Sequence, residues 1–220
     1  MTRLKLNKCA IVCLMILSSV AVFSQNIEKC YINMPERLNP VVPQKSRLEL
    51  LEYHKAGQSD SIQNRFGNQV VLQVFDTLNN RIVVKNTEST TFEMKLLKTE
   101  TGVPVVGLIR TVCSPICQST VEFYDTAWNV IPLQFVMPKA IQWINKEKLA
   151  GNPDLDKVWV ANVLENGFIS LQFDAANQYI IATNNSAEFL GDKDLKVILP
   201  VLNDQPVIYE LKGRSWVQKP

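Results

Sequence analysis

The 220-residue chain is 46% hydrophobic and 20% charged, with 23 Lys and Arg residues against 21 Asp and Glu residues. This is the composition of a globular protein with an apolar core, and the near-neutral charge gives no basic surface for binding nucleic acid. The single His excludes HExxH zinc proteases and multi-histidine metal sites, and the 8 glycines form no GxGxxG or GxxxxGK(S/T) phosphate loop. We therefore assign no catalytic, cofactor-binding or metal-ligating residue, and we expect no cofactor.

The first 24 residues have the pattern of a signal peptide. Positive side chains open the segment: Arg3, Lys5 and Lys8. Residues 9–23 carry no charge, and Val22 and Ser24 occupy the small-residue positions before a cleavage site. A membrane anchor is the weaker alternative, because a spanning helix needs about 20 apolar residues. We expect cleavage after Ser24, export to the periplasm or the extracellular space, and no membrane span in the mature chain.

One helix and a series of strands are predicted for the first half of the mature chain. Ser46 and Glu49 have the spacing of a capping box, and Gly57 ends the apolar stripe that follows, which indicates a helix over about 47–56. From Gln69 onward the apolar residues alternate with a period of two. Strands are predicted at 70–74, 82–84, 92–97, 103–112 and 120–124. The short polar turns between them predict antiparallel pairing.

The second half repeats this order of helix and then strands. Met137-Pro138 echoes Met34-Pro35, and a helix-like stretch at 140–149 follows it. Strands are predicted at 158–164, 168–174, 178–183, 195–199 and 207–211, and Asn166-Gly167 reads as a hairpin turn between the first two. We predict an α+β fold of antiparallel sheets, with two helix-then-meander halves packed as one unit. Residues 25–220 would form one domain, with 25–134 and 135–220 as candidate pseudo-repeats.

Three cysteines remain after cleavage at Ser24. Cys113 and Cys117 flank a three-residue loop between two predicted strands, where they can face each other at bridging distance. A structural disulfide is the favoured interpretation, with reduced or otherwise paired thiols as the alternative. Redox catalysis is disfavoured, because catalytic pairs have the CxxC spacing at the start of a helix. This pairing would leave Cys30 outside the bridge.

Other polar residues give weaker signals. His54 could act as a base for Ser46, Ser59 or Ser61, but no nucleophile motif accompanies it, so a surface or boundary histidine is favoured. Two pairs of carboxylates are spaced as at the start of a calcium loop: Asp154 with Asp156, and Asp192 with Asp194. Neither pair has the Gly and Glu that an EF-hand loop needs, so we read both as turns or caps.

Aromatic residues gather near the end of the strand predicted at 120–124. Phe123, Tyr124 and Trp128 could bind a partner or a glycan by stacking if they were exposed. Alternation places Phe123 and Tyr124 on opposite faces of the strand, and large aromatic residues usually fill cores. Core packing is therefore the favoured interpretation.

Several of these residues together resemble a known family. They are Met34-Pro35, Pro40, Arg47-Leu48, Thr111-Val112, Pro115, Ser119, Phe123-Tyr124-Asp125 and Trp128. The chain resembles an uncharacterised domain family, of unknown function, of exported proteins of about 200 residues from Gram-negative Bacteroidales, a size typical of one domain. The resemblance implies export and an α+β fold. It implies no activity, so it transfers no catalytic residue.

Three functions remain as hypotheses. The leading one is a non-enzymatic periplasmic or surface protein that binds a protein or glycan partner through a sheet face or the aromatic strand end. The alternatives are a hydrolase with an unrecognised Asp/Glu site and an envelope assembly factor that uses a sheet edge. A cleft with two carboxylates would favour the hydrolase, and nucleic acid is excluded as a partner.

Overall fold

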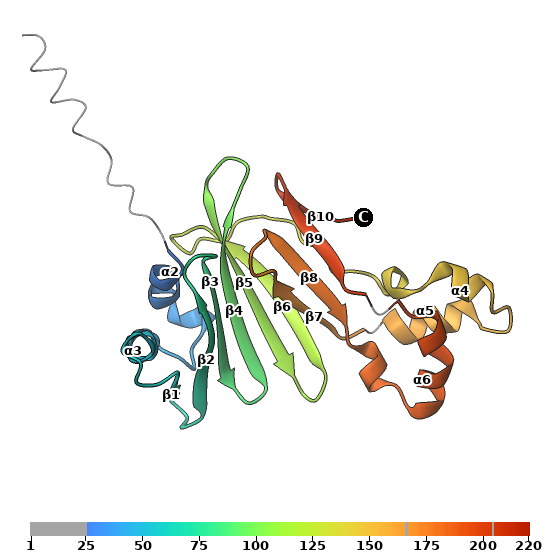
Figure 1. The fold of residues 1–220 in the computed structure, drawn as a ribbon, viewed down its shortest axis with the longest axis horizontal. Coiled ribbons are helices and arrows are strands. Elements are labelled where there is room, and N and C mark those ends of the chain that lie inside the picture. The colour runs from blue at the N-terminus through green and yellow to red at the C-terminus, as the bar shows by residue number, and fades with distance from the viewer. Residues whose placement is uncertain (1–25, 166, 204) are drawn as a thin grey trace, which may run out of the picture.

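A computed structural model describes residues 26–165, 167–203 and 205–220 (Figure 1). The expected signal peptide, 1–24, lies outside the described residues. Helices and two antiparallel sheets, of six and four strands, form the described part of the chain. This confirms the predicted α+β class, the antiparallel pairing and the packing as one unit. The pseudo-repeats 25–134 and 135–220 stay a prediction.

Helices at the N-terminal end cover one side of the larger sheet. They are α2 (Ile27–Asn33), η1 (Glu36–Leu38) and α3 (Gln44–Lys55). Helix α3 confirms the helix predicted at 47–56 but begins earlier, at Gln44, and Pro43 in the N-cap position provides no side-chain cap. The predicted capping box is therefore wrong, because Ser46 lies inside the helix. The guanidinium of Arg47 is buried and donates hydrogen bonds to the carbonyl oxygens of Val42, Ile32 and Met34, which fixes the connection between the helices.

The six-stranded sheet is a meander in chain order. Its strands are β1 (Ser61–Gln63), β2 (Gln69–Asp76), β3 (Arg81–Thr87), β4 (Thr90–Lys98), β5 (Pro104–Cys113) and β6 (Cys117–Tyr124). The five predicted strands of the first half correspond to β2–β6, while β1 and α2 were not predicted. Because side chains alternate along a strand, the sheet has two faces with different neighbours. On the helix face, Phe92 and Met94 pack with residues of α2 and α3 in one apolar core.

The opposite face of this sheet, here the groove face, receives the four-stranded sheet. That sheet has the order β10-β9-β8-β7, and its strands are β7 (Ile169–Phe173), β8 (Tyr179–Asn184), β9 (Val207–Lys212) and β10 (Ser215–Gln218). Ile109 and Phe123 on the groove face share a second apolar core with Leu171 and Phe173 of β7. The predicted strands at 168–174, 178–183 and 207–211 are confirmed, and β10 was not predicted.

A helical extension projects from the far side of the four-stranded sheet (Figure 1). It contains η2 (Ala140–Trp143), α4 (Lys146–Ala150), α5 (Lys157–Glu165), η3 (Ser186–Phe189), α6 (Asp192–Ile198) and η4 (Leu199–Val201). The helix predicted at 140–149 is present as the two short helices η2 and α4. None of the described helices is long and apolar enough to cross a membrane.

Two strands predicted in this extension are wrong. Residues 158–164 lie in α5 and residues 195–199 lie in α6 and η4. The hairpin predicted at Asn166-Gly167 therefore lacks its first strand, and Asn166 itself lies outside the described residues. The buried apolar residues of α5 have the spacing of a helix, since Val160 and Leu164 lie four residues apart and both belong to a third apolar core. β-Branched residues suggested strands, but burial on one helical stripe decided the structure.

Candidate functional site

The structure pairs Cys113 with Cys117 in a disulfide. The two residues lie opposite each other at the end of the β5–β6 ladder, and the peptide bond between Ser114 and Pro115 is cis. The favoured structural interpretation agrees with this position in a hairpin rather than at a helix start. Cys30 is buried against the helix-side core, and burial raises the pKa of its thiol to about 11.

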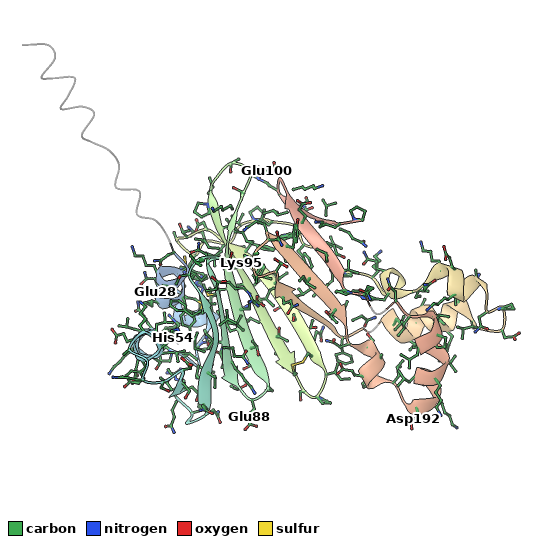
Figure 2. All side chains as sticks on the ribbon, viewed as in Figure 1. Glu28, His54, Glu88, Lys95, Glu100 and Asp192 are labelled. Atoms are coloured by element: carbon green, nitrogen blue, oxygen red, sulfur yellow. A yellow bond between two sulfur atoms is a disulfide. The ribbon has the colours of Figure 1, made fainter. Side chains whose placement is uncertain are left out.

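His54 does not meet any of the serines that we considered as nucleophiles. Its Nδ1 lies 2.6 Å from the Asp60 carboxylate, and its ring packs edge-on against Phe75. Ser59 and Ser61 bond each other instead, with their Oγ atoms 3.3 Å apart. The favoured interpretation of His54 as a boundary residue fits this arrangement. In Figure 2, His54 and Asp192 lie at opposite ends of the molecule, so they cannot share a site.

The two carboxylate pairs lie at the starts of helices. The Asp156 carboxylate accepts hydrogen bonds from the backbone N–H groups of Val158 and Trp159 at the start of α5. Asp192 and Asp194 lie in the first turn of α6. The turn at Gly191 therefore precedes a helix, not the strand that we predicted. Within the described ranges, His, Cys, Asp and Glu form no group of three that could hold a metal ion.

The three aromatic residues at the end of β6 are buried in two different cores. Phe123 is 3% exposed and belongs to the core between the sheets, whereas Tyr124 and Trp128 belong to the helix-side core. Tyr124 and Trp128 contact each other with ring centroids 5.4 Å apart. The core interpretation is correct, and this cluster offers no surface for stacking a partner.

A groove forms where the two sheets meet. Strand β7 crosses the groove face, since it contacts Glu93 on β4, Gly107 on β5 and Ser119 on β6. One wall of the groove is the part of the groove face that β7 does not cover. The other wall is the side of β7 and β8 that points away from the core between the sheets. The volume between them is about 370 Å³. Its lining is Arg81, Val83, Thr91, Glu93, Thr111, Cys113, Cys117, Ser170, Leu171, Gln172, Thr183, Asn185 and Glu188.

The free edge of β7 is held on the groove face by side chains. Leu171 donates its backbone N–H to Ser119 Oγ at 2.9 Å, and Phe173 donates its N–H to Glu93 Oε1 at 3.1 Å. Ser119 in turn bonds the Thr111 hydroxyl at 2.7 Å. Because these edge donors are satisfied, β7 does not present them to a strand from another chain.

A buried ion pair closes one end of the groove. Arg81 Nε donates to Glu93 Oε1 at 2.7 Å, with side chains that are 17% and 7% exposed. The Arg81 Nη groups have no hydrogen-bond partner within the described residues, although Arg81 lines the groove. Burial raises the pKa of the Glu93 carboxyl above its ordinary value, and the charge and hydrogen bond of Arg81 offset part of that rise.

Lys95, labelled in Figure 2, anchors the hairpin between β7 and β8. Its side chain is fully buried, and Nζ donates to the carbonyl oxygens of Asp174, Ala175 and Asn177 at 2.5, 2.9 and 2.7 Å. Burial lowers the pKa of the Lys95 ammonium, and the nearby Asp174 carboxylate acts in the opposite direction. Glu93 and Lys95 together therefore fix where the second sheet sits on the first.

The other end of the groove lies at the disulfide. Asn185 Nδ2 donates to the Cys117 carbonyl oxygen at 2.9 Å, which holds the start of η3 beside the β5–β6 hairpin. Glu188 of η3 is exposed and lines this end. The described residues include no ion-pair partner for its carboxylate. The groove thus has the Arg81–Glu93 ion pair, with the Arg81 Nη donors unused by any described residue, at one end and the Glu188 carboxylate at the other.

Sequence reasoning missed the groove residues, although one signal was present. Glu93 and Lys95 alternate with Phe92, Met94 and Leu96 in a strand whose other residues are apolar. Charged side chains on the second face of a buried strand indicate that this face meets polar partners. The partners themselves come from residues about 80 positions away, which no local pattern reveals.

The chain is similar to other proteins without an assigned activity. A family model described as "Protein of unknown function (DUF3256)" matches residues 19–216. A solved domain of an uncharacterized protein from Porphyromonas gingivalis W83 is 18% identical, with a TM-score of 0.73, and the alignment covers 89% of this chain and 100% of that one. This likeness shows the fold alone. None of the curated proteins matches the sequence.

Proposed function

Because the chain belongs to the family described as protein of unknown function (DUF3256), which supplies no activity, we propose from the geometry that it is a non-enzymatic binding protein. The binding site is the groove between the sheets. One observation carries the proposal: the groove is lined by hydrogen-bonding side chains on both walls, including Thr91, Ser170 and Thr183, while its deepest charges already neutralise each other. Such a surface can recognise a polar chain without changing it.

The proposal includes export. The charged start, uncharged stretch and small-residue end of residues 1–24 support a cleaved signal peptide. The protein would act in the periplasm or outside the cell, where the Cys113–Cys117 disulfide persists. Intact-mass measurement of the exported protein tests this: a mature chain that begins at Gln25 is expected, and a mass that retains residues 1–24 would overturn it.

Site-specific photocrosslinking in the native cells tests the binding site. A photoreactive residue at Gln172, which is exposed on the groove wall, should capture a partner. The matched control is Val158, which is 66% exposed on the helical extension and lies away from the groove lining. A partner captured at Gln172 but not at Val158 supports the proposal. Equal capture at both positions, or none at Gln172, contradicts it.

A hydrolase is the second candidate, and one observation favours it. Glu93, whose pKa is raised by burial, and Glu188 line the same groove. Two carboxyl groups can serve as acid and base on a glycosidic bond. However, Glu93 Oε1 already accepts hydrogen bonds from Arg81 and Phe173, which leaves that oxygen committed. Hydrolysis of a glycan panel that Glu93→Gln and Glu188→Gln both abolish would replace the binding proposal.

A further inference from the structure

The two ends of the groove offer different groups to a ligand: the Nη donors of the Arg81–Glu93 pair, unused within the described part of the chain, at one end and the carboxylate of Glu188 at the other. Arg81 shares a rung of the six-stranded sheet with Lys95, Gly107 and Phe123. Cys117, at the other end, lies six residues further along β6 from Phe123. At about 3.3 Å per residue, the two ends are on the order of 20 Å apart along the direction of the strands. Glu188 stands at the Cys117 end, because the neighbouring Asn185 bonds the Cys117 carbonyl.

Arg81 is placed to receive a carboxylate. Its Nε is committed to Glu93, which fixes the plane of the guanidinium, while its Nη groups make no hydrogen bond within the described ranges. A guanidinium fork pairs with a carboxylate through parallel N–H···O bonds. Glu188, exposed and without an ion-pair partner among the described residues, is placed to receive a cation.

The middle of the groove suits an extended chain. Thr91 and Thr111 are paired across β4 and β5 on one wall, and Ser170 and Thr183 are paired across β7 and β8 on the other. Their hydroxyl groups can donate to carbonyl oxygens and accept from N–H groups. None of the described lining residues is aromatic, so the groove lacks the flat platform on which a sugar ring would stack. These features favour a peptide over a glycan.

We propose that the groove binds an extended peptide of about six residues, the number that spans 20 Å, with its C-terminal carboxylate at Arg81 and a basic group at Glu188. This inference rests on the proposed binding function and names its ligand. The side chains between the two ends are small or polar, to match the hydroxyl groups that Thr91, Thr111, Ser170 and Thr183 contribute to the walls. The orientation follows from the unused Nη donors of Arg81 at one end and the Glu188 carboxylate, without an ion-pair partner among the described residues, at the other.

Calorimetric titration with a defined library tests this. The probes are hexapeptides that begin with Lys and end in a free carboxylate, with all amino acids represented at the four middle positions. At least one member should bind the mature protein. Amidation of its C-terminus should weaken binding by about tenfold or more, since it removes the partner of Arg81. Binding by no member, or equal binding of the amidated and free forms, would overturn the inference.

A charge exchange at the exposed end provides the matched variant. Glu188→Lys should weaken binding of the peptide that begins with Lys and strengthen binding of the same peptide with Glu in first position. Because Glu188 is exposed, this substitution should leave the fold unchanged. Arg81→Lys keeps a positive charge near Glu93 but loses the two Nη groups of the guanidinium, so this variant should bind the peptide more weakly than the wild type does. If Glu188→Lys leaves both peptides unchanged, the assigned orientation is wrong. If glycans bind and no peptide does, the inference fails while the binding function stands.

Discussion

The carboxylate of Glu93 on β4 accepts the backbone N–H of Phe173 on β7 at 3.1 Å, and the two residues are 80 positions apart. The same oxygen accepts Arg81 Nε. A single buried side chain thus balances a charge in one sheet and satisfies the edge of the other. Strand β7 stays on the groove face because its edge donor has this partner.

Glu93→Ala should lower the free energy of unfolding by about 3 kcal/mol, because it leaves the Arg81 charge and the Phe173 N–H without their acceptor. Glu93→Gln keeps an acceptor oxygen and should lose less. Urea unfolding followed by circular dichroism measures both. The matched control is Glu122→Ala, which breaks the more exposed Arg110–Glu122 pair and should change the free energy by less than about 1 kcal/mol. Equal effects of Glu93→Ala and Glu122→Ala would contradict this role for Glu93.

Lys95→Met should loosen the hairpin between β7 and β8. The substitution removes the donor to three carbonyl oxygens, of Asp174, Ala175 and Asn177, and should lower the free energy of unfolding by about 2 to 3 kcal/mol. Hydrogen exchange should accelerate first in residues 174–178. Lys98→Met, at an exposed position of the same strand, should leave that segment protected. Unchanged exchange in the Lys95 variant would show that the hairpin is held by other contacts.

These contacts explain how much of the structure the sequence could predict. The period-two alternation of apolar residues predicted strands β2 to β6, because the face of the sheet on which a side chain lies depends only on its position along the strand. Which element packs against each face depends on residues far away in the sequence. Glu93 and Lys95 could be seen as charges in a buried strand, but the β7 residues that meet them lie far along the chain. The fold class was therefore predictable, whereas the groove was not.

In the helical extension, in contrast, the type of local structure itself was predicted wrongly. Residues 158–164 and 195–199 contain β-branched residues that favour strands, yet both lie in helices. Ile198 and Val201 are buried three residues apart, a helical spacing that competed with this preference. The Asp156 cap at the start of α5 was a further local signal. Capping residues and burial spacing outweigh residue preference in segments this short.

The disulfide should contribute modestly to stability. It closes a loop of only five residues, 113–117, so removal by Cys113→Ser together with Cys117→Ser should cost about 2 kcal/mol or less. Non-reducing peptide mapping should recover Cys113 linked to Cys117. A peptide in which Cys30 is linked to either residue would contradict the pairing. Reduction of the wild-type protein should reproduce the stability of the double variant.

Gly107 is required by close packing. A Cβ built at this position would lie 2.5 Å from Phe173 Cζ, nearer than atoms in contact can approach. Gly107→Ala should therefore lower the free energy of unfolding by about 1 to 3 kcal/mol, measured by urea titration. Phe173→Leu shortens the opposing side chain, so Gly107→Ala should cost less in that background than in the wild type. An equal cost in both backgrounds would show that the clash is not with Phe173.

The turn after β7 should make the stability of the fold depend on pH. The Asp174 carboxylate accepts the backbone N–H groups of Asn177 and Ala176 at 2.6 and 3.0 Å. The Asn177 N–H contributes most to lowering the pKa of Asp174 below its ordinary value, and burial partly offsets this. A carboxyl group with a lowered pKa stabilises the folded state above its unfolded pKa of about 4, and this stabilisation is lost as the pH falls through the folded value.

Asp174→Asn should therefore be less stable than wild type at pH 7, and the difference should shrink as the pH falls below about 4 and through the lowered pKa at which the folded carboxyl becomes protonated. Urea unfolding at a series of pH values measures this difference directly, and it cancels the contribution of titrating groups that do not interact with Asp174. Asp154→Asn, at an exposed turn of the helical extension, reports the effect of removing one charge alone. A difference between Asp174→Asn and wild type that stays constant as the pH falls would show that the charge of Asp174 does not stabilise this turn.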